Sequence, residues 1–274
     1  MLGKLIKNEF KSTAHSMFGV FMAAGILFAV MMVVLLFKIK ILMTLTTVAM
    51  VAIAVAVLII TLFSIVSSFN KSLYGAQGYL SFTLPVTGKQ LLAGKTIVSM
   101  IWVTISFVFT IVISAFLVVY WVARTSDNVK QIIQSVYDLL QSMQGFPNPK
   151  TMIKTLILIV VIMLIRALCM IFRVSFSLAV ANTKRFQKFN PIFVGIVVYA
   201  ILFVFLMIAQ VAAMEIPFGI AITTNGIKMA IGAAAFADYN NPPIPILGYC
   251  FEIVMSAVLY VATGNIMTNH INIK

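Results

Sequence analysis

Long apolar runs alternate with short polar segments along the whole chain. Six runs are long enough for membrane-spanning helices, because a hydrocarbon core of about 30 Å requires about 20 apolar residues in a helix. The predicted spans cover residues of about 17–37, 42–68, 96–121, 153–181, 191–213 and 246–264. The pattern therefore predicts an all-α membrane protein, with residues 1–274 forming a single transmembrane domain.

Two further segments have helical periodicity but are too polar to cross a membrane. In residues 2–14 the apolar side chains recur on one face and lysines and Glu9 lie opposite, which predicts an amphipathic helix in the membrane interface. Residues 127–144 repeat apolar positions at steps of three and four, and Gly145 and Pro147 end the pattern. We expect this second amphipathic helix on the extracytoplasmic side.

The connection between the fifth and sixth spans, residues 215–245, is partly apolar but is broken by proline, threonine, asparagine and glycine. Non-helical backbone at membrane depth is tolerated only where it is buried in protein or lines a water-filled path. We interpret this connection as a re-entrant or surface-lying pair of short helices. A seventh crossing is the alternative.

Composition agrees with a membrane protein, since 62% of the residues are hydrophobic and 9% are charged. The net charge of +13 does not indicate a nucleic-acid partner, because the cations lie in short segments between apolar runs. There they act as topology signals and contact membrane lipids. Lysine and arginine favour the side of the two termini, and four of the six acidic residues lie on the other side. Both termini are therefore expected in the cytoplasm, with the chain in the plasma membrane.

The sequence lacks a recognisable catalytic, nucleotide or metal motif. The tempting stretch VTGKQ at 86–90 is not a phosphate-binding loop, which requires glycine and serine or threonine where Thr83 and Gln90 stand. Other candidate ligands are isolated in the sequence: they are Cys169, Cys250, His15 and His270. We expect no enzyme activity, cofactor or metal site in this chain, so any ATP hydrolysis would take place in a partner subunit.

Away from the first residues of the predicted spans, three charged residues lie within them: Arg166, Arg173 and Glu252. A charge at the bilayer centre costs roughly 2.5–3.5 kcal/mol on insertion scales, so it usually faces protein or water. Arg166 and Glu252 are candidates for lining a substrate path or for docking helices, and their ion pair is an open hypothesis because residue counting separates their depths by roughly 10 Å. Arg173 is expected to snorkel to the headgroups, so that its removal would matter little.

The polar stretch at residues 69–98, FNKSLYGAQGYLSFTLPVTGKQLLAGKTIV, has the most informative pattern. A Gly-Tyr-Leu at 78–80 is followed by Leu-Pro at 84–85, a Leu-Leu pair at 91–92 and Lys95. This pattern resembles the corresponding loop in permease subunits of the bacterial type-2 ABC exporter family. The amphipathic start, the six spans and the basic C-terminal end are also similar to that family.

The resemblance implies a permease subunit that exports an apolar or amphipathic substrate, such as a peptide, an antibiotic or a lipid-like molecule. It implies two ABC ATPase subunits, which would hold ATP and Mg²⁺, and a second permease copy or a homologous permease. In this family the ATPase docks on the cytoplasmic coupling loop, here residues 70–95. Relatives often have an acidic residue where Gln77 stands. The implied coupling residues are Lys71, Tyr74, Gln77, Gly78, Tyr79, Leu80 and Pro85.

Two other functions stay open. An ion-coupled secondary transporter would move its substrate without ATP, although the internal repeat that marks many such transporters is not evident in the sequence. A non-transporting membrane immunity or scaffold protein would move no substrate even with an ATPase bound.

Overall fold

The computed structural model describes residues 2–36, 40–75, 87–125, 134, 138, 149–186, 188–216, 218–223, 226–232 and 244–269. Its helices are α1 (Leu2–Leu36), α2 (Lys40–Phe69), the π-helix η1 (Asn70–Tyr74), α4 (Gly88–Thr125), α6 (Pro149–Ala181), the 3₁₀-helix η2 (Lys184–Phe186), α7 (Pro191–Met214) and α9 (Ile246–Asn269). Its strands are β1 (Phe218–Thr223), β2 (Gly226–Ile231) and β3 (Ile244–Pro245).

Six helices in this part of the chain are long and apolar enough to cross a membrane, as the sequence predicts: α1, α2, α4, α6, α7 and α9. Large apolar side chains point outward along them, including Ile41, Phe63 and Ile208. Such exposure suits helices surrounded by lipid, and the chain is accordingly consistent with a multi-pass membrane protein. It divides into two compact units, residues 1–129 with 272–274 and residues 130–271.

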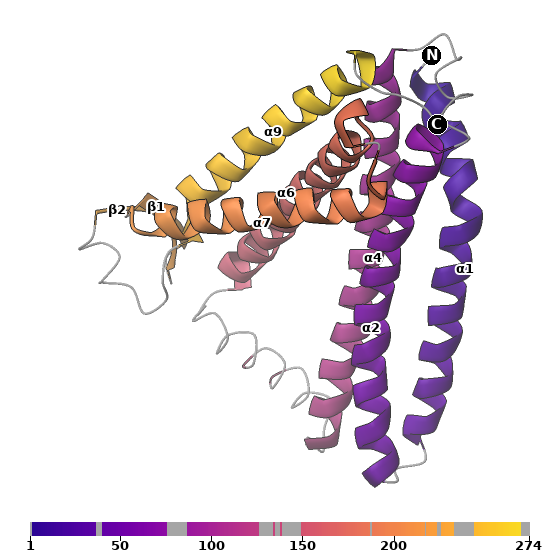
Figure 1. Ribbon diagram of the computed structural model, residues 1–274. Coiled ribbons are helices and arrows are strands. Elements are labelled where there is room, and N and C mark those ends of the chain that lie inside the picture. The colour runs from indigo at the N-terminus through magenta and orange to yellow at the C-terminus, as the bar shows by residue number, and fades with distance from the viewer. Residues whose placement is uncertain are drawn as a thin grey trace. The chain divides into compact units, whose positions relative to one another are not determined.

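In the first unit α1, α2 and α4 all pack against one another (Figure 1). Their shared core is centred on Met50, Ala54 and Ile113. Aromatic rings of α1 and α4 meet beside it, with the Phe28 and Phe116 ring centroids 5.4 Å apart. The three helices thus form one bundle. Between helices surrounded by lipid, van der Waals packing takes the place of the hydrophobic effect that holds a soluble protein together.

Helix α1 begins earlier than the first predicted span and includes the segment expected as a separate interfacial helix over residues 2–14. It is continuous from Leu2 to Leu36. The residues at the expected junction, Ala14 to Met17, include neither proline nor glycine and so permit an unbroken helix. A position of residues 2–14 in the membrane interface stays a prediction.

Helix α4 begins at Gly88, ahead of the predicted span start near residue 96, because Thr87 and Gln90 form a capping box. The Thr87 amide donates to Gln90 Oε1 at 3.2 Å, and the Gln90 amide donates to Thr87 Oγ1 at 3.3 Å. At the other side of the connection α2 continues into the π-helix η1, closed by the Gly75 amide bound to the Asn70 carbonyl at 2.9 Å. Helices therefore enter the predicted coupling loop, residues 70–95, from both sides.

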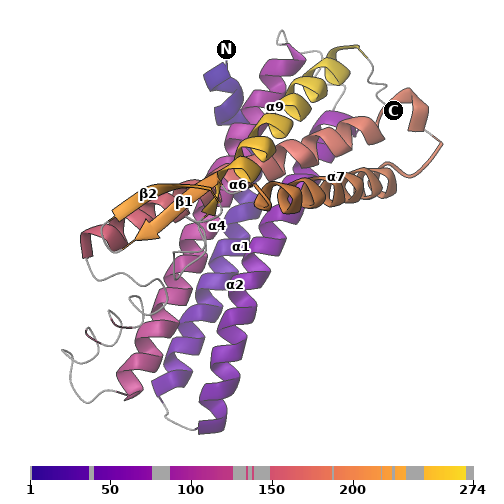
Figure 2. The same cartoon turned by 90° about the vertical axis from the view of Figure 1, so that its left-hand side faces the viewer.

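In the second unit α6 packs against both α7 and α9, and α7 contacts α9 (Figure 2). Helix α7 starts where Asn190 caps it, accepting a hydrogen bond from the Ile192 amide at 3.0 Å, and Pro191 takes the first helical position. The Phe172 and Tyr260 rings, 4.6 Å apart, fix α6 beside α9.

The described part of residues 215–245 is a β-hairpin, so the expected pair of short helices is wrong there. Strand β1 pairs antiparallel with β2, from Phe218 opposite Ile231 to Thr223 opposite Gly226. Strand β3 adds to the other edge of β1 through Ile244 and Pro245. The two six-residue strands exchange hydrogen bonds with each other, so about half of their backbone groups are satisfied within the segment.

Most of the amphipathic helix predicted over residues 127–144 lies outside the described residues. Positions 134 and 138 are described, and both are helical. The Gln134 side-chain amide donates to Asp138 Oδ1 at 3.1 Å, a contact between residues one helical turn apart.

Candidate functional site

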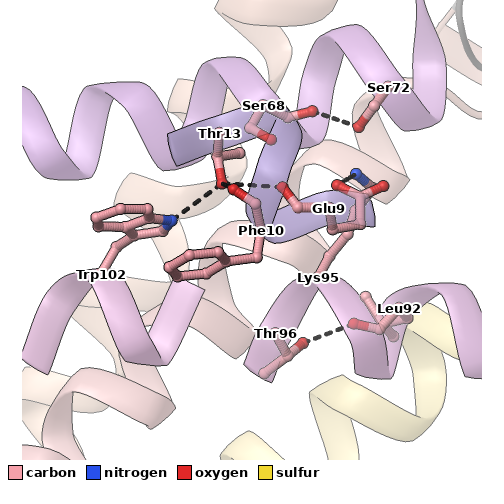
Figure 3. A network of polar contacts seen from close by, with 9 residues as sticks. All are labelled: Glu9, Phe10, Thr13, Ser68, Ser72, Leu92, Lys95, Thr96 and Trp102. Atoms are coloured by element: carbon pink, nitrogen blue, oxygen red, sulfur yellow. Dashed lines mark hydrogen bonds and ion pairs between the residues drawn. The ribbon is translucent and has the colours of Figure 1, made fainter. Parts of the chain in front are cut away.

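A buried ion pair joins α1 to α4 in the first unit. The Lys95 side chain is only 2% exposed, and its Nζ lies 2.7 Å from Glu9 Oε2 (Figure 3). An apolar helix holds this lysine inside the bundle, where the charge requires a partner. Glu9 is the single acidic residue in the first 126 positions of the sequence, so it is the partner that the local composition supplies.

The first turns of α1 are also fastened to Trp102 of α4. The indole Nε1 donates to Thr13 Oγ1 at 2.9 Å, and the Phe10 ring stacks on the indole with centroids 5.0 Å apart (Figure 3). The two helices approach closely at Gly94, where a Cβ atom would lie 2.5 Å from Leu5 Cδ2. Two polar contacts and one aromatic stack therefore hold the first turns of α1 on α4.

A polar cavity of about 470 Å³ lies beside the Glu9–Lys95 pair. Most of its wall consists of hydroxyl groups from α1 and α2 and the following turn: Ser12, Thr13, Ser16, Ser64, Ser67, Ser68 and Ser72. Lys71, a predicted coupling residue, is exposed and lines the same cavity. This surface can hold water or a polar headgroup, in contrast to the apolar faces around it.

Both ends of the predicted coupling loop are buried in the first unit. At its start Leu73 and Tyr74 are buried, and the Tyr74 hydroxyl has no hydrogen-bond partner among the described residues. At its end Leu91 and Leu92 are buried one turn before Lys95. The other predicted coupling residues lie outside the described residues: Gln77, Gly78, Tyr79, Leu80 and Pro85.

The second unit contains a cluster of four polar residues, which we call the Glu252 cluster: Arg166 and Arg173 of α6, Gln210 of α7 and Glu252 of α9. Glu252 is buried, and its Oε1 accepts a hydrogen bond from Arg173 Nη2 at 3.1 Å. Its Oε2 accepts one from Gln210 Nε2 at 2.9 Å. One carboxylate therefore links all three helices of the unit.

Arg166 occupies the rim of the Glu252 cluster. Its Nε lies 3.7 Å from Glu252 Oε2, its Nη2 lies 3.4 Å from Gln210 Oε1, and its Cζ lies 5.1 Å from the centre of the Tyr249 ring. The side chain is 50% exposed. Arg166 and Glu252 thus form the hypothesised ion pair, but at a distance near the upper limit for such pairs. Arg173 is the cation nearer to the Glu252 carboxylate.

The expectation that Arg173 snorkels away is wrong, because its side chain is 11% exposed and turned to Glu252. Arg166 and Arg173 are seven residues apart, which is about two turns and places both on one face of α6. Side chains on a helix lean toward its N-terminus, so Arg173 reaches back to the level of Glu252. Counting residues from each span end missed this, since the relative register of α6 and α9 depends on their packing.

Sequence reasoning also missed the roles of Glu9, Thr13, Trp102 and Gln210. For Glu9 the signal was its isolation among so many apolar residues, and for Gln210 it was a lone amide inside an apolar helix. Among the described residues, no three or more His, Cys, Asp or Glu side chains are grouped so that they could hold a metal ion. No protein-family model, curated protein or solved structure matches the chain.

Proposed function

We propose that this chain is the permease subunit of a bacterial ATP-driven exporter of the type-2 ABC family. It pairs with a second permease copy or a homologue and with two ATPase subunits, which supply ATP hydrolysis. Both termini and residues 70–95 face the cytoplasm in this proposal. Support comes from the six apolar helices and from the pattern at residues 69–98.

The observation that carries the proposal is the anchoring of the loop at both ends. Leu73 and Tyr74 hold its start within the first unit, and Leu91 and Leu92 hold its end. Lys95 of α4 also links this end of the loop to α1, through its ion pair with Glu9. A push on residues 76–86 would therefore reach α1, α2 and α4 together, as expected of an element that passes nucleotide-driven movement to the spans.

Tyr79→Ala is expected to weaken the hold of the permease on its ATPase. Loss of a tyrosine anchor at an interface centre costs about 1–2 kcal/mol or more, so retention of the ATPase should fall by roughly tenfold. The measurement is affinity purification of the tagged full chain from its native membranes, followed by vanadate-sensitive ATP hydrolysis in the eluate. Tyr199→Ala, the same change on α7, is the matched control and should retain the activity.

The alternatives give different results in the same preparation. If Tyr79→Ala and Gly78→Ala both retain the ATPase fully, docking of the ATPase through these two residues is contradicted. Substrate movement that continues without ATP and stops with an ionophore would favour an ion-coupled transporter. An ATPase-free preparation in which no substrate moves would favour an immunity or scaffold protein.

A further inference from the structure

The Glu252 cluster contains more positive than negative charge. Two guanidinium groups, those of Arg166 and Arg173, share the single carboxylate of Glu252. Gln210 contributes hydrogen bonds and no charge. Isolated charges are strongly disfavoured in an apolar medium, so a cluster with one excess positive charge attracts a further anion.

The two short hydrogen bonds to the Glu252 carboxylate come from residues other than Arg166. One oxygen already accepts from Arg173 and the other accepts from Gln210, both within 3.1 Å. The two polar contacts of Arg166 are longer, at 3.4 Å to Gln210 and 3.7 Å to Glu252, which is the long limit for hydrogen bonds and ion pairs. Its guanidinium makes no further hydrogen bond to the described residues, so N–H donors remain available on its exposed side.

Arg173 Nε is buried and has no hydrogen-bond partner among the described residues. Nη2 of the same guanidinium is the atom that donates to Glu252. Native proteins leave few buried polar atoms unpaired, so Arg173 Nε marks a place where the described residues do not satisfy every polar group.

Arg166 lies far from either end of its membrane span. The span in α6 runs from Ile157 to Ala181, so Arg166 is about 13 Å from its start at 1.5 Å per residue. Met163 precedes it by one turn and is an exposed apolar side chain. Because helical side chains lean toward the N-terminus, the Arg166 guanidinium and the Met163 side chain cover neighbouring parts of the α6 surface. A charged group and an apolar surface therefore adjoin there.

We propose that Arg166 binds the negatively charged headgroup of an amphipathic molecule, a phosphate in the first instance, whose apolar part lies along α6 beside Met163. A guanidinium fork matches the oxygen pairs of a phosphate, and the bound anion neutralises the excess charge of the Glu252 cluster. That this ligand is the exported cargo rests on the proposed function. The binding itself requires no ATPase.

The test uses the full chain in non-ionic detergent micelles, with dodecyl phosphate as the probe and dodecanol as its uncharged counterpart. Wild-type protein is expected to bind dodecyl phosphate at least about tenfold more tightly than dodecanol, as charge-assisted hydrogen bonds provide. Arg166→Gln should remove that preference, whereas Arg166→Lys, which keeps the charge but not the fork, should retain part of it. Lys154→Gln, an equal loss of charge at an exposed site on α6, should leave the preference unchanged.

Three binding results and one stability result would overturn the proposal. The first is equal binding of both probes by the wild-type chain, and the second is an unchanged preference in Arg166→Gln. The third is inorganic phosphate binding as tightly as dodecyl phosphate, which would identify a free-anion site without an apolar part.

Arg166→Gln removes the excess charge, so the melting temperature of the ligand-free variant should be equal to or above that of wild type. A lower melting temperature would instead assign Arg166 a purely structural role. Since no step uses ATP, failure here leaves the ATPase experiment unaffected.

Discussion

Replacing Glu252 by leucine is expected to destabilise the second unit by about 3–5 kcal/mol, the usual cost of breaking a buried ion pair from one side. The substitution leaves Arg173, 11% exposed, without its carboxylate and removes the acceptor of the Gln210 amide. The polar contacts that Glu252 makes with α6 and with α7 are lost together, which makes this the largest single effect expected there. The free energy of unfolding in bicelles or the melting temperature in micelles measures it.

The matched control is the double variant Arg173→Met with Glu252→Leu. Removing both charges replaces a buried pair by apolar side chains of similar size, so most of the lost stability should return. Arg173→Met alone should be destabilising much less than Glu252→Leu alone, because Arg166 remains as a cation for the carboxylate. Stability of Glu252→Leu equal to that of wild type would show that the Glu252 cluster does not hold the three helices together.

The number of helices long and apolar enough to cross a membrane could be predicted, because it depends on composition and length alone. Each membrane-spanning helix must cross the same hydrocarbon thickness, so the number of sufficiently long apolar runs gives the number of such helices directly. The same reasoning identified Arg166 and Glu252 as unusual, since charges in such runs are rare. Their true arrangement could not be predicted, because the axial register of α6 against α9 depends on contacts such as Phe172 with Tyr260.

The hairpin between α7 and α9 had a signal in the sequence that the helical interpretation overlooked. Asn225-Gly226 stands between two short apolar runs, and an Asn-Gly pair flanked by apolar residues favours a hairpin. The lack of a clear helical period over residues 218–231 pointed the same way. Isoleucine and alanine also occur in apolar helices, and the segment stands between two such helices, so composition alone did not distinguish a helix from a strand here.

The stretch VTGKQ also has a local meaning that its likeness to a phosphate loop concealed. Threonine followed three residues later by glutamine is a capping box, and Thr87 with Gln90 forms one at the start of α4. Because of this capping box, α4 begins at Gly88 instead of near residue 96. The connection between α2 and α4 that a partner could dock on is shorter as a result. The coupling role of residues 76–86 stays a prediction.

Replacing Glu9 by alanine is expected to detach the first turns of α1 from α4 and to cost about 3–5 kcal/mol in the first unit. Lys95 is 2% exposed and would lose its carboxylate partner at 2.7 Å. Phe10 and Thr13 lie on the same turns as Glu9 and hold Trp102, so their contacts should loosen with it. Trp102 fluorescence reports this directly, as a shift of its emission to longer wavelength when the indole meets water.

The measurement is made in a Trp121→Phe background, which leaves Trp102 as the single tryptophan. Glu9→Gln tests the charge apart from the hydrogen bond and should give an intermediate shift. The double variant Glu9→Leu with Lys95→Met removes both charges and should restore the emission and most of the stability. If Glu9→Ala changes neither property, residues 2–14 are not fastened to α4 and instead lie in the membrane interface, as their amphipathic pattern alone would place them. The ion pair and the interfacial position thus make opposite predictions for one substitution, because only the first requires a carboxylate at residue 9.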